Sequence, residues 1–171
     1  MGQYWVFGYG SLIWRPDFRF MESHIGCISG WSRRFWQGSP DHRGTPARPG
    51  RVVTLIVAPG QRCWGRLFRL DPGDAQEIFR RLDFRERGGY NRVIEDAELL
   101  DGRSVSSLTY VASPDNLNYL GPASLTTVAD RVRSAVGPSG TNRDYALRLA
   151  EAIRGMGQSD SHVFELVALL V

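Results

Sequence analysis

The alternation of strand-like runs with glycine- and proline-rich turns in the first 70 residues limits the possible folds more than any other feature. Four runs are rich in aromatic and β-branched side chains, and they span residues 4–9, 24–36, 51–58 and 63–70. Such runs, bounded by Gly and Pro, are typical of β-strands. Because they are consecutive and closely spaced, they favour an antiparallel sheet or a small barrel. Residues 38–50, rich in Pro, Gly and Arg, predict a long loop.

After residue 70 the spacing of apolar residues changes from that of a strand to that of a helix. Asp71 followed by Pro72 is typical of a helix N-cap and first turn. Apolar side chains then recur at helical spacing, at Ala75, Ile78, Phe79 and Leu82. We therefore expect a helix from about Pro72 to about Phe84. Residues 90–99 and 104–112 next predict a hairpin that turns at Asp101-Gly102.

The last third of the chain is helical in pattern. One apolar face begins at Leu125, a second follows Gly140, and residues 163–171 predict a further short helix. Strands first and helices later indicate an α+β fold, with a small antiparallel or mixed β-barrel and flanking C-terminal helices. The 171 residues contain no internal repeat and no linker composition. A single domain spanning 1–171 is therefore expected.

Composition indicates an ordinary soluble protein, and the absence of membrane and signal patterns predicts a cytoplasmic location. Hydrophobic residues make up 42% of the chain and charged residues 23%, which excludes a disordered class. No apolar run approaches the roughly 18 residues of a membrane span, and residues 1–5 lack the pattern of a signal peptide. We expect no membrane partner, and in the cytoplasm Cys27 and Cys63 should stay free thiols.

The turn Gly8-Tyr9-Gly10-Ser11 follows the first strand directly. A dinucleotide-binding fingerprint would need a third glycine, but Ile13 stands there and Pro16 interrupts any long helix. The same Ile13 breaks the pattern of a serine nucleophile elbow. What remains is an open backbone turn, which either faces an anion or carbonyl oxygen or carries no ligand at all.

Glu86 lies at the expected end of the first helix, between Arg85 and Arg87 and before Gly88-Gly89. Two interpretations stay open from the pattern alone. It is either a solvated charge paired to a neighbouring arginine, which is the commoner case, or a carboxylate held for chemistry.

Two other polar clusters point to no ligand. Asp41-His42-Arg43 lacks the spacing of metal ligands, so no metal site is expected. The run Trp31 to Trp36 mixes arginines with aromatic residues, as nucleic-acid binders do. A strand with one buried face explains it equally well, and a formal net charge of +3 is low for a polyanion binder. No nucleic-acid partner is expected.

Taken together, six blocks resemble the ChaC-like γ-glutamylcyclotransferases. They cover residues 6–14, 33–39, 41–44, 49–55, 82–90 and 119–123. The resemblance implies the γ-glutamylcyclotransferase-like fold for residues 1–171. It also implies a lyase or acyltransferase reaction of glutathione catabolism, in which reduced glutathione yields 5-oxoproline and cysteinylglycine.

The resemblance also implies which residues form the site. The family's catalytic glutamate falls on Glu86. Its substrate turn covers Tyr9 to Leu12, with contacts extending back to Val6, so the implied binding residues are Val6, Phe7, Gly8, Tyr9, Gly10, Ser11 and Leu12. A tyrosine on the C-terminal helical segment matches Tyr145. No cofactor is implied.

Elementary chemistry is compatible with one carboxyl group as the only catalyst. Closing a five-membered ring is intramolecular, so orientation lowers much of the barrier. The attacking amine must lose a proton and the leaving nitrogen must gain one, which a single acid/base group can do. Two alternatives stay open: a cyclotransferase for other γ-glutamyl amino acids or amines, and a non-enzymatic regulator of cation transport.

Overall fold

The computed structural model describes residues 2–171, which form two compact units. The first unit combines the residues up to 32 with residues 57–111, and the second combines 33–56 with 112–171. The predicted turn and Glu86 belong to the first unit, and Tyr145 belongs to the second. Each unit is therefore described by itself, and the single-domain organisation of 1–171 stays a prediction.

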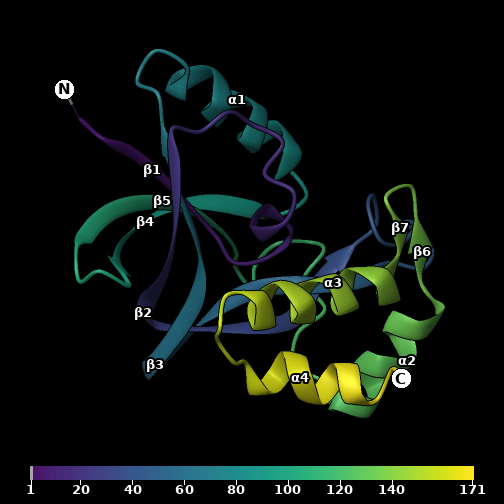
Figure 1. The fold of residues 1–171 in the computed structure, drawn as a ribbon. Coiled ribbons are helices and arrows are strands. Elements are labelled where there is room, and N and C mark those ends of the chain that lie inside the picture. Colours follow the sequence, from purple (N-terminus) through teal and green to yellow (C-terminus); the bar gives the residue numbers. More distant parts are fainter. Residues whose placement is uncertain (1) are drawn as a thin grey trace. The chain divides into compact units, whose positions relative to one another are not determined.

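A closed five-stranded barrel has the strand order β1-β3-β2-β4-β5 (Figure 1). Its strands are β1 (Tyr4–Gly8), β2 (Glu22–Ser39), β3 (Gly50–Leu70), β4 (Tyr90–Leu99) and β5 (Ser104–Ala112). β1 is antiparallel to β3, with Val6 opposite Phe68, and parallel to β5, with Val6 opposite Leu108. β2 is antiparallel to β4. The prediction of a small mixed barrel with C-terminal helices in an α+β fold is confirmed.

One predicted break in the sheet is wrong. The runs 51–58 and 63–70 were expected to be separate strands, but β3 continues from Gly50 to Leu70. Gly60 has a φ of +82°, and a Cβ built there would meet no atom within 4 Å. Because glycine adopts this backbone conformation readily, the chain passes Pro59-Gly60 without leaving the ladder.

The helix α1 (Ala75–Arg85) begins three residues later than the expected Pro72. The Asp71 side chain accepts a hydrogen bond from the Gly73 amide at 2.7 Å, and the Asp71 carbonyl accepts from Asp74 and Ala75. These bonds make residues 71–74 a turn, since an Asp side chain that bonds its own backbone competes with helix. The end of the helix falls one residue beyond the expected Phe84.

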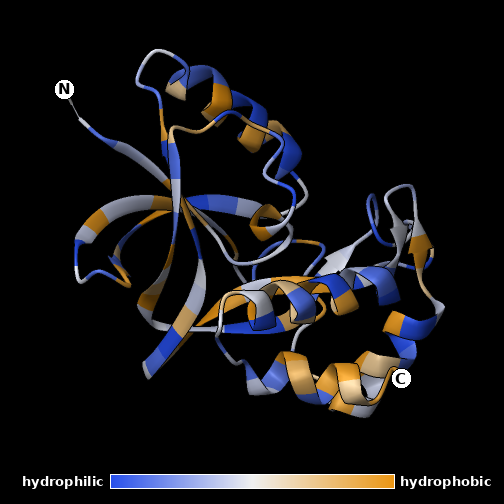
Figure 2. Cartoon of the chain, in the orientation of Figure 1, coloured by the Kyte–Doolittle hydropathy of each residue, from blue (hydrophilic) through white to orange (hydrophobic). Residues whose placement is uncertain are grey.

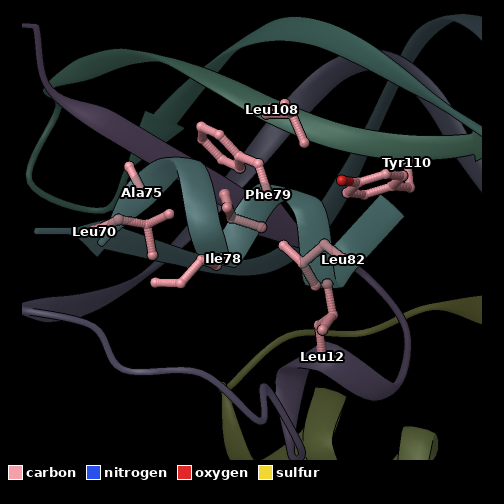
Figure 3. Packing of buried hydrophobic residues seen from close by; sticks show 9 residues of the cluster. Leu12, Leu70, Ala75, Ile78, Phe79, Leu82, Leu108 and Tyr110 are labelled. Atoms are coloured by element: carbon pink, nitrogen blue, oxygen red, sulfur yellow. The ribbon is translucent and has the colours of Figure 1, made fainter. Parts of the chain in front are cut away.

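The expected apolar face of α1 is confirmed. It packs on residues of β1, β3 and β5 in one hydrophobic cluster (Figure 3). The buried members are Val6, Leu12, Leu70, Ala75, Ile78, Phe79, Leu82, Leu108 and Tyr110. The predicted hairpin is also confirmed, and Gly102, with a φ of +86°, occupies its turn.

The second unit contains three helices that contact one another: α2 (Leu125–Ser134), α3 (Asn142–Gly155) and α4 (Ser161–Ala168). Figure 2 shows α4 as mostly hydrophobic, whereas α3 alternates between hydrophobic and hydrophilic residues. Side chains cap all three N-termini, from Ser124, Thr141 and Asp160. A short pair of strands, β6 (Val136–Gly137) and β7 (Gly140–Thr141), separates α2 from α3 and was not predicted.

Cys27 and Cys63 are both buried and are not joined in a disulfide. Within residues 2–171, none of the helices has both the length and the apolar character that a membrane span requires.

Candidate active site

The turn after β1 is tight because it contains glycine. β1 ends at Gly8, and a short 3₁₀ helix, η1 (Ser11–Ile13), follows at once. A Cβ atom at Gly8 would lie 2.7 Å from the Cβ of Leu12, so a larger residue does not fit without movement. The Tyr9 hydroxyl donates to the Tyr110 carbonyl at 2.6 Å, which ties the turn to β5.

The residues in and before this turn differ in how deeply they are buried. Val6 and Phe7 are fully buried in the first unit, and Leu12 packs in the cluster around α1. Gly10 and Ser11 are only partly buried. The side chains of Val6 and Phe7 therefore belong to the core, and contact of a ligand with either residue stays a prediction.

Glu86 forms the C-cap of α1. Its amide donates to the Leu82 carbonyl at 2.8 Å, and its own carbonyl accepts from the Tyr90 amide at 3.1 Å. Gly89 follows with a φ of +127°, a conformation that glycine tolerates best and that turns the chain from the helix into β4. The Glu86 side chain is 19% exposed, so it is shielded but reachable.

Arg85 joins the two predicted parts of the site. Its Nη2 donates to the Ser11 hydroxyl at 2.8 Å, and its Nε lies 3.8 Å from Oε1 of Glu86. Arg87 instead stacks on the Phe84 ring, at 3.9 Å from the ring centroid. Glu86 is thus beside an arginine, as one interpretation of the pattern held, and that arginine also holds the turn.

A second set of contacts near Glu86 was missed by the sequence analysis. Asp83, one helical turn before Glu86, accepts from Arg92 at 2.7 and 2.6 Å and from the Tyr110 hydroxyl at 2.7 Å. The Arg92 hydrogen bonds lower the pKa of the Asp83 carboxyl. Burial, followed by the bond to Asp83, raises the pKa of Tyr110 far above its ordinary value. This phenol stays protonated and anchors the end of α1 to β5.

Tyr145 lies on α3 in the second unit. Its hydroxyl accepts from the Val53 amide at 3.3 Å, its ring meets Phe35 edge to face, and the Arg43 guanidinium lies 5.6 Å from the ring centroid. The side chain is almost fully buried. Its membership of the site stays a prediction, as do the roles of Glu86 and of the turn residues.

The described residues lack the arrangement that a metal site requires. Within residues 2–171, no three His, Cys, Asp or Glu residues are placed to share a metal ion. The cluster Asp41-His42-Arg43 lies in the second unit, where the His42 ring contacts the Ser139 hydroxyl at 3.3 Å on the protein surface.

Comparison with known sequences gives matches along almost the whole chain. A family model described as ChaC-like protein matches residues 4–171. Glutathione-specific gamma-glutamylcyclotransferase 1 of Danio rerio is 42% identical over 173 residues, which cover 98% of this chain and 88% of the relative. Gamma-glutamylcyclotransferase 2-3 of Arabidopsis thaliana is 44% identical and covers 95% of this chain and 85% of its own length.

Solved structures give the same result. The crystal structure of a γ-glutamyl cyclotransferase specific to glutathione from yeast superposes with a TM-score of 0.92 at 29% identity, over 99% of this chain and 96% of the other. A structure described as gamma-glutamyl cyclotransferase has a TM-score of 0.61 at 13% identity, over 98% of this chain and 88% of that one, which shows a shared fold.

Proposed function

Because the chain belongs to the ChaC-like protein family, we propose that it is an enzyme that degrades reduced glutathione to 5-oxoproline and cysteinylglycine. The observation that carries this proposal is the match to glutathione-specific relatives. They align with 95% or more of this chain at 39 to 42% identity in fish and human. The yeast structure extends that match to the fold.

The reaction needs one new bond and one broken bond. The α-amine nitrogen of the γ-glutamyl group attacks the carbonyl carbon of its own γ-amide, which closes the five-membered ring. The former amide bond then breaks, and its nitrogen leaves as the amine of cysteinylglycine. No water is consumed and no electron is transferred, so the atoms balance without a cofactor.

Glu86 is proposed as the acid and base. The attacking amine begins as an ammonium group, and the Glu86 carboxylate accepts its proton before or during attack. The same carboxyl group then returns a proton to the leaving nitrogen. Its position supports this role, because the side chain at the C-cap of α1 is partly exposed and lies beside Arg85, which contacts the turn.

The turn from Gly8 to Leu12 is proposed to hold the γ-glutamyl group. It leads directly into the short helix η1, which begins at Ser11. Backbone N–H groups of such an open turn can stabilise the oxygen of the attacked carbonyl as it becomes an oxyanion. The turn would also align the amine with the carbonyl carbon, and this orientation lowers the barrier of the ring closure further.

The proposed setting is the cytoplasm, with reduced glutathione as the partner molecule and no nucleic acid or membrane involved. The cytoplasm keeps thiols reduced, which suits both the substrate and the unbridged thiols of Cys27 and Cys63.

Purified protein incubated with glutathione tests the proposal directly. Mass spectrometry should detect 5-oxoproline and cysteinylglycine in equal amounts, in the absence of added metal or nucleotide and with a chelator present. Glutathione disulfide and simple γ-glutamyl amino acids are the comparison substrates. Glutathione should react fastest.

Each contrary result has a distinct meaning. Faster turnover of γ-glutamyl amino acids would overturn the glutathione assignment but keep the cyclotransferase. Absence of 5-oxoproline from every substrate, with folded protein, would favour the non-enzymatic alternative. Loss of turnover in chelator would show that a metal takes part.

A further inference from the structure

Arg85 contacts both the proposed substrate turn and the residues that follow the turn. Its Nη2 donates to the Ser11 hydroxyl at 2.8 Å, and its Nη1 donates to the Arg15 carbonyl at 3.2 Å. Nη1 also lies 3.5 Å from the Asp17 carboxylate. The guanidinium therefore contacts three points of one segment, residues 11–17, which is 74 positions away from it at Ser11.

These contacts repeat one turn earlier on the same helix. Leu82, three residues before Arg85, packs with Leu12 in one buried cluster, and Figure 3 shows the two side chains next to each other. Two successive turn residues, Ser11 and Leu12, thus meet two α1 residues that share a helical face. One contact is polar and the other is apolar, so together they fix both the distance and the rotation of the turn against α1.

Apolar contacts also hold this part of the chain, since Phe18, directly after the segment, packs against the α1 cluster. Arg85 also lines a cavity of about 150 Å³ whose wall includes Pro16 and Ile78. Beside this cavity, Arg85 adds the polar contacts that help to set the position of the segment along α1. A lysine cannot replace it fully, because its donors share one nitrogen, whereas Nη1 and Nη2 of the planar guanidinium reach the carbonyl and the hydroxyl in a fixed geometry.

Arg85 is also the covalent neighbour of Glu86. Any movement of the turn relative to Arg85 is consequently a movement relative to the proposed acid and base. The Arg85 Nε, 3.8 Å from Oε1 of Glu86, adds a direct electrostatic restraint on the carboxylate.

We propose that Arg85 is a positioning residue, which sets the distance between the substrate turn and Glu86 without binding substrate itself. The proposal rests on the proposed function of the turn and of Glu86. It predicts that substrate still binds the turn when Arg85 is lost, but that the bound amine and carbonyl no longer face the carboxyl group correctly. Misplacement of this kind lowers kcat more than it raises KM.

The test compares Arg85→Ala with Arg81→Ala. Arg81 lies on the same helix one turn earlier, is exposed and lines the same cavity. With glutathione as substrate, Arg85→Ala should lower kcat by about 10²-fold, the size expected for a small misplacement, and change KM by less than about threefold. Arg81→Ala should stay within about twofold of wild type.

A double-mutant cycle with Ser11→Ala separates positioning from general stability. If Arg85 acts through the turn, the combined variant should lose less than the product of the two single losses. Should Arg85→Ala fail to fold, Arg85→Lys keeps the charge, loses the fork, and should lower kcat by about tenfold with KM unchanged.

Three results would overturn the proposal: a large rise in KM with kcat unchanged, which makes Arg85 a binding residue; independent, multiplicative losses in the cycle; or equal activity of Arg85→Ala and Arg81→Ala. All three require an active wild-type enzyme. An inactive wild type would instead contradict the proposed function, so the two failures are distinguishable.

Discussion

The proposed site in the first unit and the interior of the second unit use arginine in opposite ways. Around the proposed site in the first unit, Arg85 is 25% exposed and Arg92 is 43% exposed, and each pairs with a carboxylate that solvent also reaches. In the second unit the Arg33 side chain is 1% exposed, and Arg43 and Arg51 are almost as deeply buried. The comparison separates charges that a ligand can approach from charges that only hold the fold.

Burial and hydrogen bonding explain why we expect the second group to contribute to stability. Arg51 donates to the carbonyls of Phe35 and Gly121, and burial lowers its pKa. Asn142 exchanges two hydrogen bonds with the Arg51 backbone, at 2.7 and 2.8 Å. Such groups are costly to leave unpaired, so we expect substitutions there to change stability and substitutions near Glu86 to change turnover.

The largest expected effect is on turnover in the first unit. Glu86→Gln keeps the shape of the side chain but removes its ability to take a proton, so kcat should fall by about 10²- to 10⁴-fold. KM should change far less, and the urea unfolding curve should match that of wild type. Steady-state kinetics on glutathione measures the change. If this variant cyclised glutathione at nearly the wild-type rate, Glu86 would not be the acid and base, and its interpretation as a solvated charge would be correct.

The largest expected effect on stability is in the second unit. Asp160 forms an ion pair with Arg33 at 2.6 Å and caps α4 through the Val163 amide. Asp160→Ala leaves the buried guanidinium without its carboxylate, and the free energy of unfolding should fall by about 3–5 kcal/mol.

The matched control for that change is Asp130→Ala. Asp130 pairs with Arg133 on the exposed surface of α2, and such a pair contributes at most about 1 kcal/mol. Urea denaturation measures both variants. Equal losses for Asp160→Ala and Asp130→Ala would show that burial of Arg33 does not set the cost.

A pH-dependent loss of stability is expected from His162. The Phe35 amide donates to its Nε2 at 3.1 Å, and burial, with nearby Arg34, lowers its pKa to about 4 from an ordinary 6.5. Between these two values the unfolded chain binds a proton that the folded chain does not. Stability should therefore fall as pH drops from 6.5 toward 4, by up to about 3 kcal/mol.

His162→Gln should flatten this part of the pH dependence, because its amide oxygen can still accept from Phe35 but does not titrate. His42→Gln, at an exposed position, is the control and should keep the wild-type slope. Urea unfolding between pH 4 and 7 gives the comparison. An unchanged slope in His162→Gln would mean that other groups carry the pH dependence.

The smallest expected effect comes from a helix cap in the second unit. The Ser124 hydroxyl accepts from the Thr127 amide at 3.1 Å at the start of α2. Ser124→Ala should lower the free energy of unfolding by about 1 kcal/mol and leave kcat and KM unchanged. Ser124→Asp, which keeps a side-chain acceptor at the cap, should have the free energy of unfolding of wild type. A change in turnover would contradict the separation between the two units.

Local patterns predicted most of the fold because they depend on near neighbours in sequence. The 3.6-residue spacing from Ala75 to Leu82 predicted the buried face of α1, and alternating runs around Asp101-Gly102 predicted the β4–β5 hairpin. The errors were local as well. The chain continued through Gly60 where a turn was expected, and Asp71 formed a turn where a helix start was expected.

The candidate site was predicted in its parts but not in its assembly. The glycines of the turn and the place of Glu86 at a helix end are readable from residue order alone. Nothing in that order indicated that Arg85 would reach Ser11, or that Asp83 would bind Arg92 and Tyr110. The sequence left the pairing of Glu86 open between Arg85 and Arg87, and the structure decided it.

By itself, then, the sequence determined the type and order of the elements, the tight turn after β1 and the carboxylate at the end of α1. The tertiary structure decided the closure of the barrel through the parallel pairing of Val6 with Leu108, the Arg85 link across 74 positions and the Arg33–Asp160 pair across 127. The reason is physical. Periodicity and turn chemistry act over a few residues, whereas these pairings exist only after barrel closure and helix packing have brought distant side chains together.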